Sequence, residues 1–287
     1  MRTAVVTGAT GFLGTAVVRT LGDAGYTVRL AGLGTRSDPL TAERIAALDR
    51  FELLVHCAGG SSVAASLQDP LDDFEKTVPP LACLLDHIRT RTPQARVVLL
   101  SSAAVYGNAE QLPTSETCRI APVSPYGFHK RMCEELCLSY GHNHGVASVV
   151  LRLFSVYGPG LRKQLLWDAC RKARAGDVTF AGTGDEERDW LHVDDAAALV
   201  VAAAAHASPE VAIFNGAGGA GIRVRDVVGQ ICRELGAGAP QFSGSARPGD
   251  PQRYVADIAR ARALGWSPRI DLARGISQFV TWFKEQG

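Results

Sequence analysis

Near its start the chain reads Thr3-Ala4-Val5-Val6-Thr7-Gly8-Ala9-Thr10-Gly11-Phe12-Leu13-Gly14. A short β-branched run enters a turn with three evenly spaced glycines, and an apolar helical pattern follows. Because glycine has no Cβ, such a turn can bend tightly, bring backbone N–H groups close to a phosphate, and point the positive end of the next helix at it. At the end of a first strand, Gly8, Gly11 and Gly14 therefore predict a site for the diphosphate of a dinucleotide.

Beyond this turn, short β-branched runs alternate with longer helical patterns through most of the chain. The alternation predicts an α/β fold with a doubly wound parallel sheet and helices on both faces. Strands are expected at Thr3–Thr7, Thr27–Ala31, Leu53–Ala58, Val97–Ser101 and Ser148–Leu153. Helices are expected at Phe12–Ala24, Thr41–Leu48, Asp72–Thr90, Tyr126–His142, Leu165–Ala175, Ala196–His206, Val224–Leu235 and Leu272–Glu285.

The alternation loosens after Gly160, and the sequence has neither an internal repeat nor a low-complexity linker. We therefore expect a dinucleotide-binding domain over residues 1–160 and a smaller C-terminal region, mainly residues 161–287, that is interleaved with it. Part of the segment 187–215 is expected to return to the first domain.

Composition excludes several other classes of function. With 30 basic and 29 acidic residues the net charge is +1, so no strong positive field attracts nucleic acid or an anionic membrane. No apolar run reaches the ~18 residues of a membrane-spanning helix, and the first residues resemble a strand rather than a leader. Seven scattered cysteines without metal-ligand spacing predict reduced thiols and no metal site. We expect a cytoplasmic protein.

The residues after the second expected strand bear on the choice of dinucleotide. An acid there binds the ribose 2′-hydroxyl of NAD, whereas a basic residue accommodates the 2′-phosphate of NADP. The stretch from Val28 to Arg36 contains no acid, and Arg36 is a basic residue that can pair with a phosphate. The stretch therefore favours NADP over NAD. The equally supported alternative is that Arg36 is a solvated loop residue with no role in binding.

A phenol and an ammonium stand four residues apart at Tyr126 and Lys130, in a helix expected to open after Pro125. Four residues bring two side chains onto the same face of a helix. A neighbouring cation favours the ionised form of a phenol, whose ordinary pKa is about 10, and makes it usable as an acid or base. Ser101 and Ser102 end an expected strand, where a hydroxyl can hold the oxygen of a substrate.

Further motifs accompany these residues. Together they are Thr7–Gly14, Leu54–Gly59, Ser101–Gly107, Ser124–Lys130, Arg152–Gly160, Arg188–Asp195, Phe214–Gly216 and Arg247–Asp250. In this combination the chain resembles, over almost its whole length, the extended short-chain dehydrogenase/reductases, a family of nucleotide-sugar epimerases, dehydratases and 4-ketoreductases. The resemblance implies a Rossmann-type domain that binds NAD or NADP, a smaller C-terminal substrate-binding domain, and a nucleotide-diphosphate sugar as substrate.

The resemblance also implies roles for single residues. Tyr126 would be the acid/base, Ser102 the catalytic hydroxyl, and Lys130 the cation that favours the phenolate and bonds the nicotinamide ribose. The cofactor would contact Gly8, Gly11, Phe12, Leu13, Gly14, Arg36, Ala58, Gly59, Ser101, Tyr126, Lys130 and Phe154. The substrate would contact Ser102, Ala103, Tyr126, Ser155, Gln164, Arg188, Arg247 and Asp250. The two arginines suit its diphosphate, and Asp250 suits a ribose hydroxyl of the nucleotide.

Departures from the family pattern narrow the choice between the possible reactions. Dehydratases have an Asp-Glu pair directly after the catalytic hydroxyl, but this chain has Ala103-Ala104, and two methyl groups move no protons. A nucleotide-sugar 4-epimerase is the favoured function. An NADPH-dependent 4-keto-6-deoxysugar reductase is the alternative, because Gly32 replaces the usual acid after the second strand. A non-catalytic dinucleotide-binding protein is the remote alternative. A homodimer is expected, since relatives often dimerise through the helix at Tyr126–His142.

Overall fold

The computed structural model describes residues 2–31, 40–48, 50–245 and 252–286. Within these residues, six parallel strands form a sheet in the order β2-β1-β3-β4-β5-β9. They are β1 (Arg2–Thr7), β2 (Tyr26–Ala31), β3 (Leu53–His56), β4 (Arg96–Ser102), β5 (Ser148–Leu153) and β9 (Ala212–Gly216). The inner strands are buried along nearly their whole length, as in sheets covered on both faces. The predicted doubly wound parallel sheet is confirmed.

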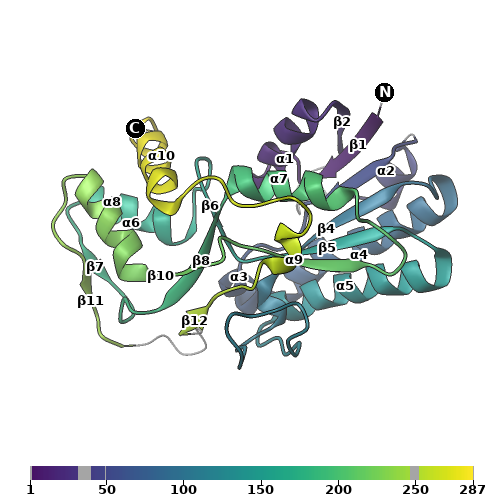
Figure 1. The fold of residues 1–287 in the computed structure, drawn as a ribbon. Helices are drawn as coiled ribbons and strands as arrows, with labels where there is room; N and C mark the ends of the chain where they lie inside the picture. The colour runs from purple at the N-terminus through teal and green to yellow at the C-terminus, as the bar shows by residue number, and fades with distance from the viewer. Residues whose placement is uncertain (1, 32–39, 49, 246–251, 287) are drawn as a thin grey trace.

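Helices cover both faces of this sheet, with α1 and α7 on one face and α4 and α5 on the other (Figure 1). The helices are α1 (Phe12–Asp23), α2 (Ala42–Ala46), α4 (Pro70–Arg91), α5 (Pro125–His144) and α7 (Val193–Ala204). One apolar core includes Val17 and Leu199 under the first pair, and another includes Leu84 and Cys137 under the second. In the part of the chain that the structure describes, no helix is both long and apolar enough to cross a membrane.

A smaller group of elements, which we name the C-terminal lobe, lies to one side of the sheet (Figure 1). It contains β6 (Ser155–Tyr157), α6 (Gln164–Arg174), β7 (Thr179–Phe180), β8 (Glu187–His192), β10 (Gly221–Arg223), α8 (Val224–Glu234), β11 (Gln241–Phe242), β12 (Arg253–Tyr254) and α10 (Leu272–Lys284). The lobe has its own core, where α6, α8 and α10 pack around Phe279 and Phe283. Between β8 and β10 the chain returns to the sheet through α7 and β9.

The structure differs from the expected elements in a few places. The helix expected from Ala196 begins at Val193, because the side chain of His192 accepts a hydrogen bond from the Asp194 N–H (3.2 Å) and caps it. The helix expected at Thr41–Leu48 is shorter. Elements for which no bounds were predicted are α3 (Val63–Gln68), the 3-10 turn η1 (Ala103–Val105), α9 (Ala259–Arg262) and the strands from β6 onward. Several of these segments are too short to give a periodic signal, whereas β8 and β9 are as long as strands that were predicted.

Candidate active site

In the sheet, β2 lies on one side of β1 and β3 lies on the other. The connections that follow β1 and β3 therefore lead in opposite directions and leave a crevice between the ends of these two strands. Ligands of open α/β sheets bind at such a switch point, outside the carboxyl ends of the strands. A cavity of about 1850 Å³ lies there and extends to the C-terminal lobe. Since sites for one small ligand span roughly 300–1,000 Å³, this cavity has room for a dinucleotide and a second ligand.

The glycine turn after β1 forms one wall of the cavity. Gly8 has a φ of +63°, and a Cβ there would lie 2.8 Å from the backbone nitrogen of Ala58. A Cβ on Gly14 would lie 2.0 Å from the carbonyl oxygen of Gly8, so α1 packs this close only with glycine. The N-cap residue of α1 is Gly11, which has no side chain to bond the first N–H groups of the helix. This arrangement fits a phosphate at the helix start.

Thr7 holds the loop after β3 against this turn. Its Oγ1 lies 2.9 Å from Nδ1 of His56 and accepts a hydrogen bond from the Ala58 N–H (3.2 Å). Burial, and then the charge of Lys130, lower the pKa of His56 to about 3, so its imidazole is neutral at physiological pH. Burial raises the pKa of the neighbouring Cys57 to about 12, which excludes a thiolate nucleophile at this position.

The helix that carries Tyr126 begins at a defined point on the other wall. Ser124 is its N-cap and accepts a hydrogen bond from the Gly127 N–H (3.2 Å), and Pro125 occupies the first helical position. The Tyr126 N–H donates to the Ser66 Oγ of α3 (3.1 Å). Two independent contacts therefore set where the phenol enters the cavity.

Lys130 lies one turn further along α5 and is buried, with 6% of its surface exposed. Its ammonium donates to the carbonyl oxygen of Leu100 (3.0 Å) and lies 5.8 Å from the centroid of the Tyr126 ring. The helix therefore holds a buried cation beside the phenol of Tyr126.

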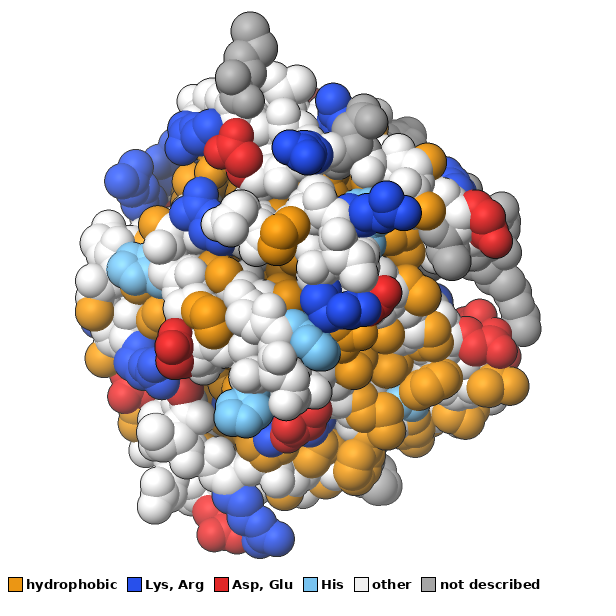
Figure 2. Space-filling model, turned by 90° about the vertical axis from the view of Figure 1, so that its right-hand side faces the viewer, with side chains coloured by type: hydrophobic (Ala, Val, Ile, Leu, Met, Phe, Trp, Pro, Cys, Tyr) orange, Lys and Arg blue, Asp and Glu red, His pale blue; other side chains and the backbone are white. Residues whose placement is uncertain are grey.

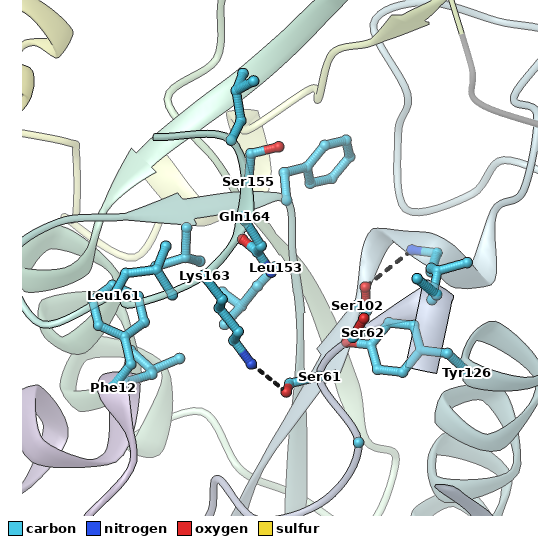
Figure 3. A pocket seen from close by; sticks show the side chains of 18 of the residues that line it. Phe12, Ser61, Ser62, Ser102, Tyr126, Leu153, Ser155, Leu161, Lys163 and Gln164 are labelled. Atoms are coloured by element: carbon cyan, nitrogen blue, oxygen red, sulfur yellow. Dashed lines mark hydrogen bonds between the residues drawn. The ribbon is translucent and has the colours of Figure 1, made fainter. Parts of the chain in front are cut away.

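Ser102 ends β4 beside the phenol. Figure 3 shows the side chains of Ser102, Ser62 and Tyr126 close together at one end of the cavity. The Ser102 Oγ accepts a hydrogen bond from the Ala104 N–H (3.1 Å), and within the described chain this is its only hydrogen bond. Its hydroxyl proton is therefore available to an acceptor in the cavity.

A buried network anchors α5 behind these residues. Glu134 is fully buried and accepts hydrogen bonds from Ser101 Oγ (2.6 Å) and from Nε and Nη2 of Arg152 (3.0 and 2.8 Å). Arg152 also donates to the hydroxyl of Tyr106 (3.0 Å), which donates to Oδ1 of Asn215 (2.7 Å). The network ties α5 to β4, β5 and β9, so the helix keeps a fixed position relative to the end of β4.

The cavity brings together most of the residues that the sequence singled out. They are Gly8, Gly11, Phe12, Leu13, Gly14, Ala58, Gly59, Ser101, Ser102, Tyr126, Lys130, Phe154, Ser155, Gln164 and Arg188. Among the described residues Ala103 is the exception, because η1 turns its side chain into an apolar cluster, where it is 1% exposed. Its neighbour Ala104 borders the cavity instead. Gly32, Arg36, Arg247 and Asp250 lie outside the described residues.

Sequence reasoning missed part of the wall in the C-terminal lobe. Tyr254 lines the cavity because β12 pairs with β8, and its ring packs on Phe154 with centroids 5.1 Å apart. Another cavity, of about 220 Å³, adjoins the first and is bordered by Arg188 and Trp190. The alternation of side chains along a strand places these two residues on one face of β8. The alternation could have predicted Trp190 as a lining residue from the position of Arg188, whereas no sequence pattern pointed to Tyr254.

The same elements recur in known proteins. The sequence model of the NAD dependent epimerase/dehydratase family matches residues 4–215, a range that includes the glycine turn, Ser102, Tyr126, Lys130 and Arg188. The chain belongs to this family. The resemblance to extended short-chain dehydrogenase/reductases that the motifs carried is thereby confirmed.

Members of the NAD dependent epimerase/dehydratase family similar to this chain have more than one activity. The UDP-glucose 4-epimerase of Azospirillum brasilense is 31% identical, over 95% of this chain and 89% of that protein. The dTDP-glucose 4,6-dehydratase of Streptomyces griseus is 31% identical, over 97% and 93%. A structure of the UDP-glucose 4-epimerase of Thermotoga maritima with UDP-glucose has a TM-score of 0.89 at 26% identity and covers 99% of each chain. The similarity therefore extends over both lobes, in a family of nucleotide-sugar epimerases and dehydratases.

Proposed function

We propose that the protein is an NAD(P)-dependent nucleotide-diphosphate-sugar 4-epimerase with Tyr126 as its acid/base. One observation carries the proposal: Ser102, Tyr126, Lys130 and Arg188 border a single cavity with the glycine turn. The Azospirillum brasilense and Thermotoga maritima relatives support this choice, since both are UDP-glucose 4-epimerases. Residues 1–160 would hold the dinucleotide, and the region of residues 161–287 would hold most of the nucleotide sugar.

In the proposed reaction the phenolate of Tyr126 removes the proton of the sugar 4-hydroxyl while Ser102 donates a hydrogen bond to the same oxygen. The glycine turn at Gly8, Gly11 and Gly14 would hold the dinucleotide, which would supply the acceptor and donor for the hydride of C4. Lys130 would hold its positive charge beside the phenol, and Tyr126 would give the proton back to the 4-keto oxygen after the sugar has turned its other face. Arg188 would hold the diphosphate through this rotation.

Dehydration at C5 and C6 is disfavoured at this site. Elimination of water needs a further acid and base beside the catalytic hydroxyl, but the two residues after Ser102 are alanines. Ala103 packs in an apolar cluster, and Ala104 presents a methyl group to the cavity. Similarity to the Streptomyces griseus dehydratase therefore indicates common ancestry rather than a common reaction.

The second candidate is an NADPH-dependent reductase of 4-keto-6-deoxysugar nucleotides, favoured by Gly32 where the family has an acid. Mass spectrometry of the denatured, purified protein separates the two. Stoichiometric NAD(H) or NADP(H) supports the epimerase, which recycles its cofactor. A purified protein that carries no dinucleotide but consumes NADPH when a 4-keto sugar nucleotide is added supports the reductase.

Tyr126→Phe tests the proton shuttle that both candidates share. We expect kcat to fall by roughly 10²- to 10⁴-fold, the range of general acid–base catalysis, with cofactor affinity unchanged. Tyr140→Phe, on the same helix but outside the cavity lining, is the control and should keep full activity. Unchanged turnover in Tyr126→Phe refutes the assignment, and a protein that binds no dinucleotide refutes the proposed function as a whole.

The protein would act as a homodimer that buries an apolar surface of α3, α4 and α5. Leu67, Leu71, Phe128 and Met132 are exposed there by 63, 63, 50 and 44%. Figure 2 shows hydrophobic side chains gathered over the lower part of one face of the molecule, the side on which α4 and α5 lie in Figure 1. Phe128→Asp with Met132→Asp should convert the dimer to a monomer in light scattering, and a wild-type monomer would contradict the proposal.

A further inference from the structure

Lys163 connects the two walls of the cavity. It directly precedes α6 in the C-terminal lobe, and its ammonium donates a hydrogen bond to Ser61 Oγ (2.6 Å), in the loop after β3 and 102 positions away in the chain. Figure 3 shows this contact in the middle of the cavity, with Phe12 of the glycine turn on one side and Tyr126 on the other. A dinucleotide that extends from the glycine turn to Tyr126 has to pass this point.

The backbone fixes both partners of this contact. The loop that carries Ser61 is held by the Gly60 N–H, which donates to Thr77 Oγ1 of α4 (2.8 Å). On the other wall, Gln164 follows Lys163 with a φ of +66°, a left-handed conformation that residues with a Cβ rarely adopt. Strained positions of this kind cluster at ligand sites, and Lys163 and Gln164 both line the cavity.

Lys163 is exposed to solvent and has no carboxylate partner among the described residues. Partial burial, and then the nearby Lys76, lower the pKa of its ammonium. Lys76 has a carboxylate partner in Asp72 at 2.8 Å. In the described parts of the chain, Lys163 has only the neutral hydroxyl of Ser61. An anion in the cavity would therefore gain a cation that no carboxylate of the described residues neutralises.

We propose that Lys163 binds a phosphate group of the ligand and so links the C-terminal lobe to the cofactor crevice. The inference rests on the proposed function, because it assumes that a diphosphate enters this cavity. The position of Ser61 favours the dinucleotide as the source of that phosphate. Ser61 lies three residues after Ala58, against which Gly8 of the glycine turn packs. The diphosphate of the nucleotide sugar is the other source of the same chemistry.

Contact from the C-terminal lobe would make cofactor retention depend on both lobes. An epimerase profits from such a contact, since its dinucleotide has to stay bound between the two hydride transfers. A loss of the Lys163 charge should then speed cofactor release as well as weaken binding.

Isothermal titration of Lys163→Met, on protein freed of any dinucleotide bound during purification, tests the proposal with NAD⁺, NADP⁺, four nucleoside diphosphates (UDP, dTDP, GDP and ADP) and their nucleosides. Met keeps the aliphatic length and removes the charge, Lys163→Arg keeps the charge, and Lys284→Met, on the exposed side of α10, is the matched control. We expect the dissociation constant of the dinucleotide to rise about 10- to 100-fold in Lys163→Met, the loss typical of a hydrogen bond to a charged group. Lys163→Arg and Lys284→Met should stay within about threefold of wild type.

Salt dependence separates a charge contact from a structural role. Raising the salt concentration should weaken ligand binding by wild type more than by Lys163→Met, because salt screens the interaction that the variant lacks. If only the nucleoside diphosphate loses affinity, while its nucleoside does not, the phosphate belongs to the substrate and the phosphate role is supported. Equal affinities of wild type and Lys163→Met for every probe overturn the proposal. If wild type itself binds none of the probes, the proposed function fails first.

Discussion

Removal of Glu134 should expose how strongly the buried network holds α5. Its carboxylate is fully buried and accepts hydrogen bonds from Ser101, from two nitrogens of Arg152, and from Arg131 Nη1 (3.2 Å). Burial alone would lower the pKa of Arg152, but the hydrogen bonds and charge of Glu134 outweigh it and raise that pKa. Glu134→Leu would leave this guanidinium, which is 2% exposed, with only the Tyr106 hydroxyl and a backbone carbonyl.

Breaking a buried ion pair by removing one partner costs about 3–5 kcal/mol, because the other charge stays desolvated. Proteins have a total stability of about 5–15 kcal/mol, so Glu134→Leu should lose about a fifth of it or more. Arg152→Met should cost a similar amount, since Glu134 then keeps only Ser101 and Arg131. The double variant removes both charges, so its cost should be close to that of one single variant, with a coupling energy of at least about 2 kcal/mol.

Urea unfolding followed by tryptophan fluorescence measures all four free energies of unfolding. The m-value should stay constant, so that changes in the midpoint report stability alone. Single variants that each lose under about 1 kcal/mol, or a double variant whose loss equals the sum of the singles, would show that the pair is not coupled as its geometry implies.

Three further predictions concern packing and pH. In Gly14→Ala the new Cβ would lie 2.0 Å from the Gly8 oxygen, so the variant should bind the dinucleotide more weakly and lose about 1–3 kcal/mol of stability. Titration and urea unfolding measure the two effects, and wild-type values would contradict the prediction. Gly275→Ala would place a Cβ 2.1 Å from the Tyr157 hydroxyl, so the melting temperature of the variant should fall. Adding Tyr157→Phe should partly restore the melting temperature, and no rescue would show that the hydroxyl is not the obstacle. Burial lowers the pKa of His56 to about 3, so the unfolded chain binds more protons between pH 3 and 6.5. Stability should therefore rise with pH in that window by up to about 1.4 kcal/mol per unit, and His56→Gln should flatten the urea-unfolding profile unless other groups carry it.

Local features of the site were predictable because they depend on neighbours in the chain. The glycine turn needs only a strand before it and a helix after it, and the four-residue spacing of Tyr126 and Lys130 follows from the period of a helix. The end of β4 at Ser102 is likewise visible as the point where an apolar run meets two serines. For the same reason the main strands and helices were predicted with small errors at their ends.

Contacts between distant segments were not predictable, since no local pattern encodes them. The Glu134–Arg152 pair joins a helix to a strand, and Lys163 meets Ser61 only because the C-terminal lobe closes over the crevice. Whether Ala103 or Ala104 borders the cavity depends on how η1 packs against the apolar cluster. By itself, then, the sequence determined the strand and helix pattern, the glycine turn and the Tyr126–Lys130 spacing, which short-range backbone geometry sets. Only the tertiary structure decided which side chains share one cavity and which distant partners they meet there, because burial and long-range contact exist only once the lobes have packed together.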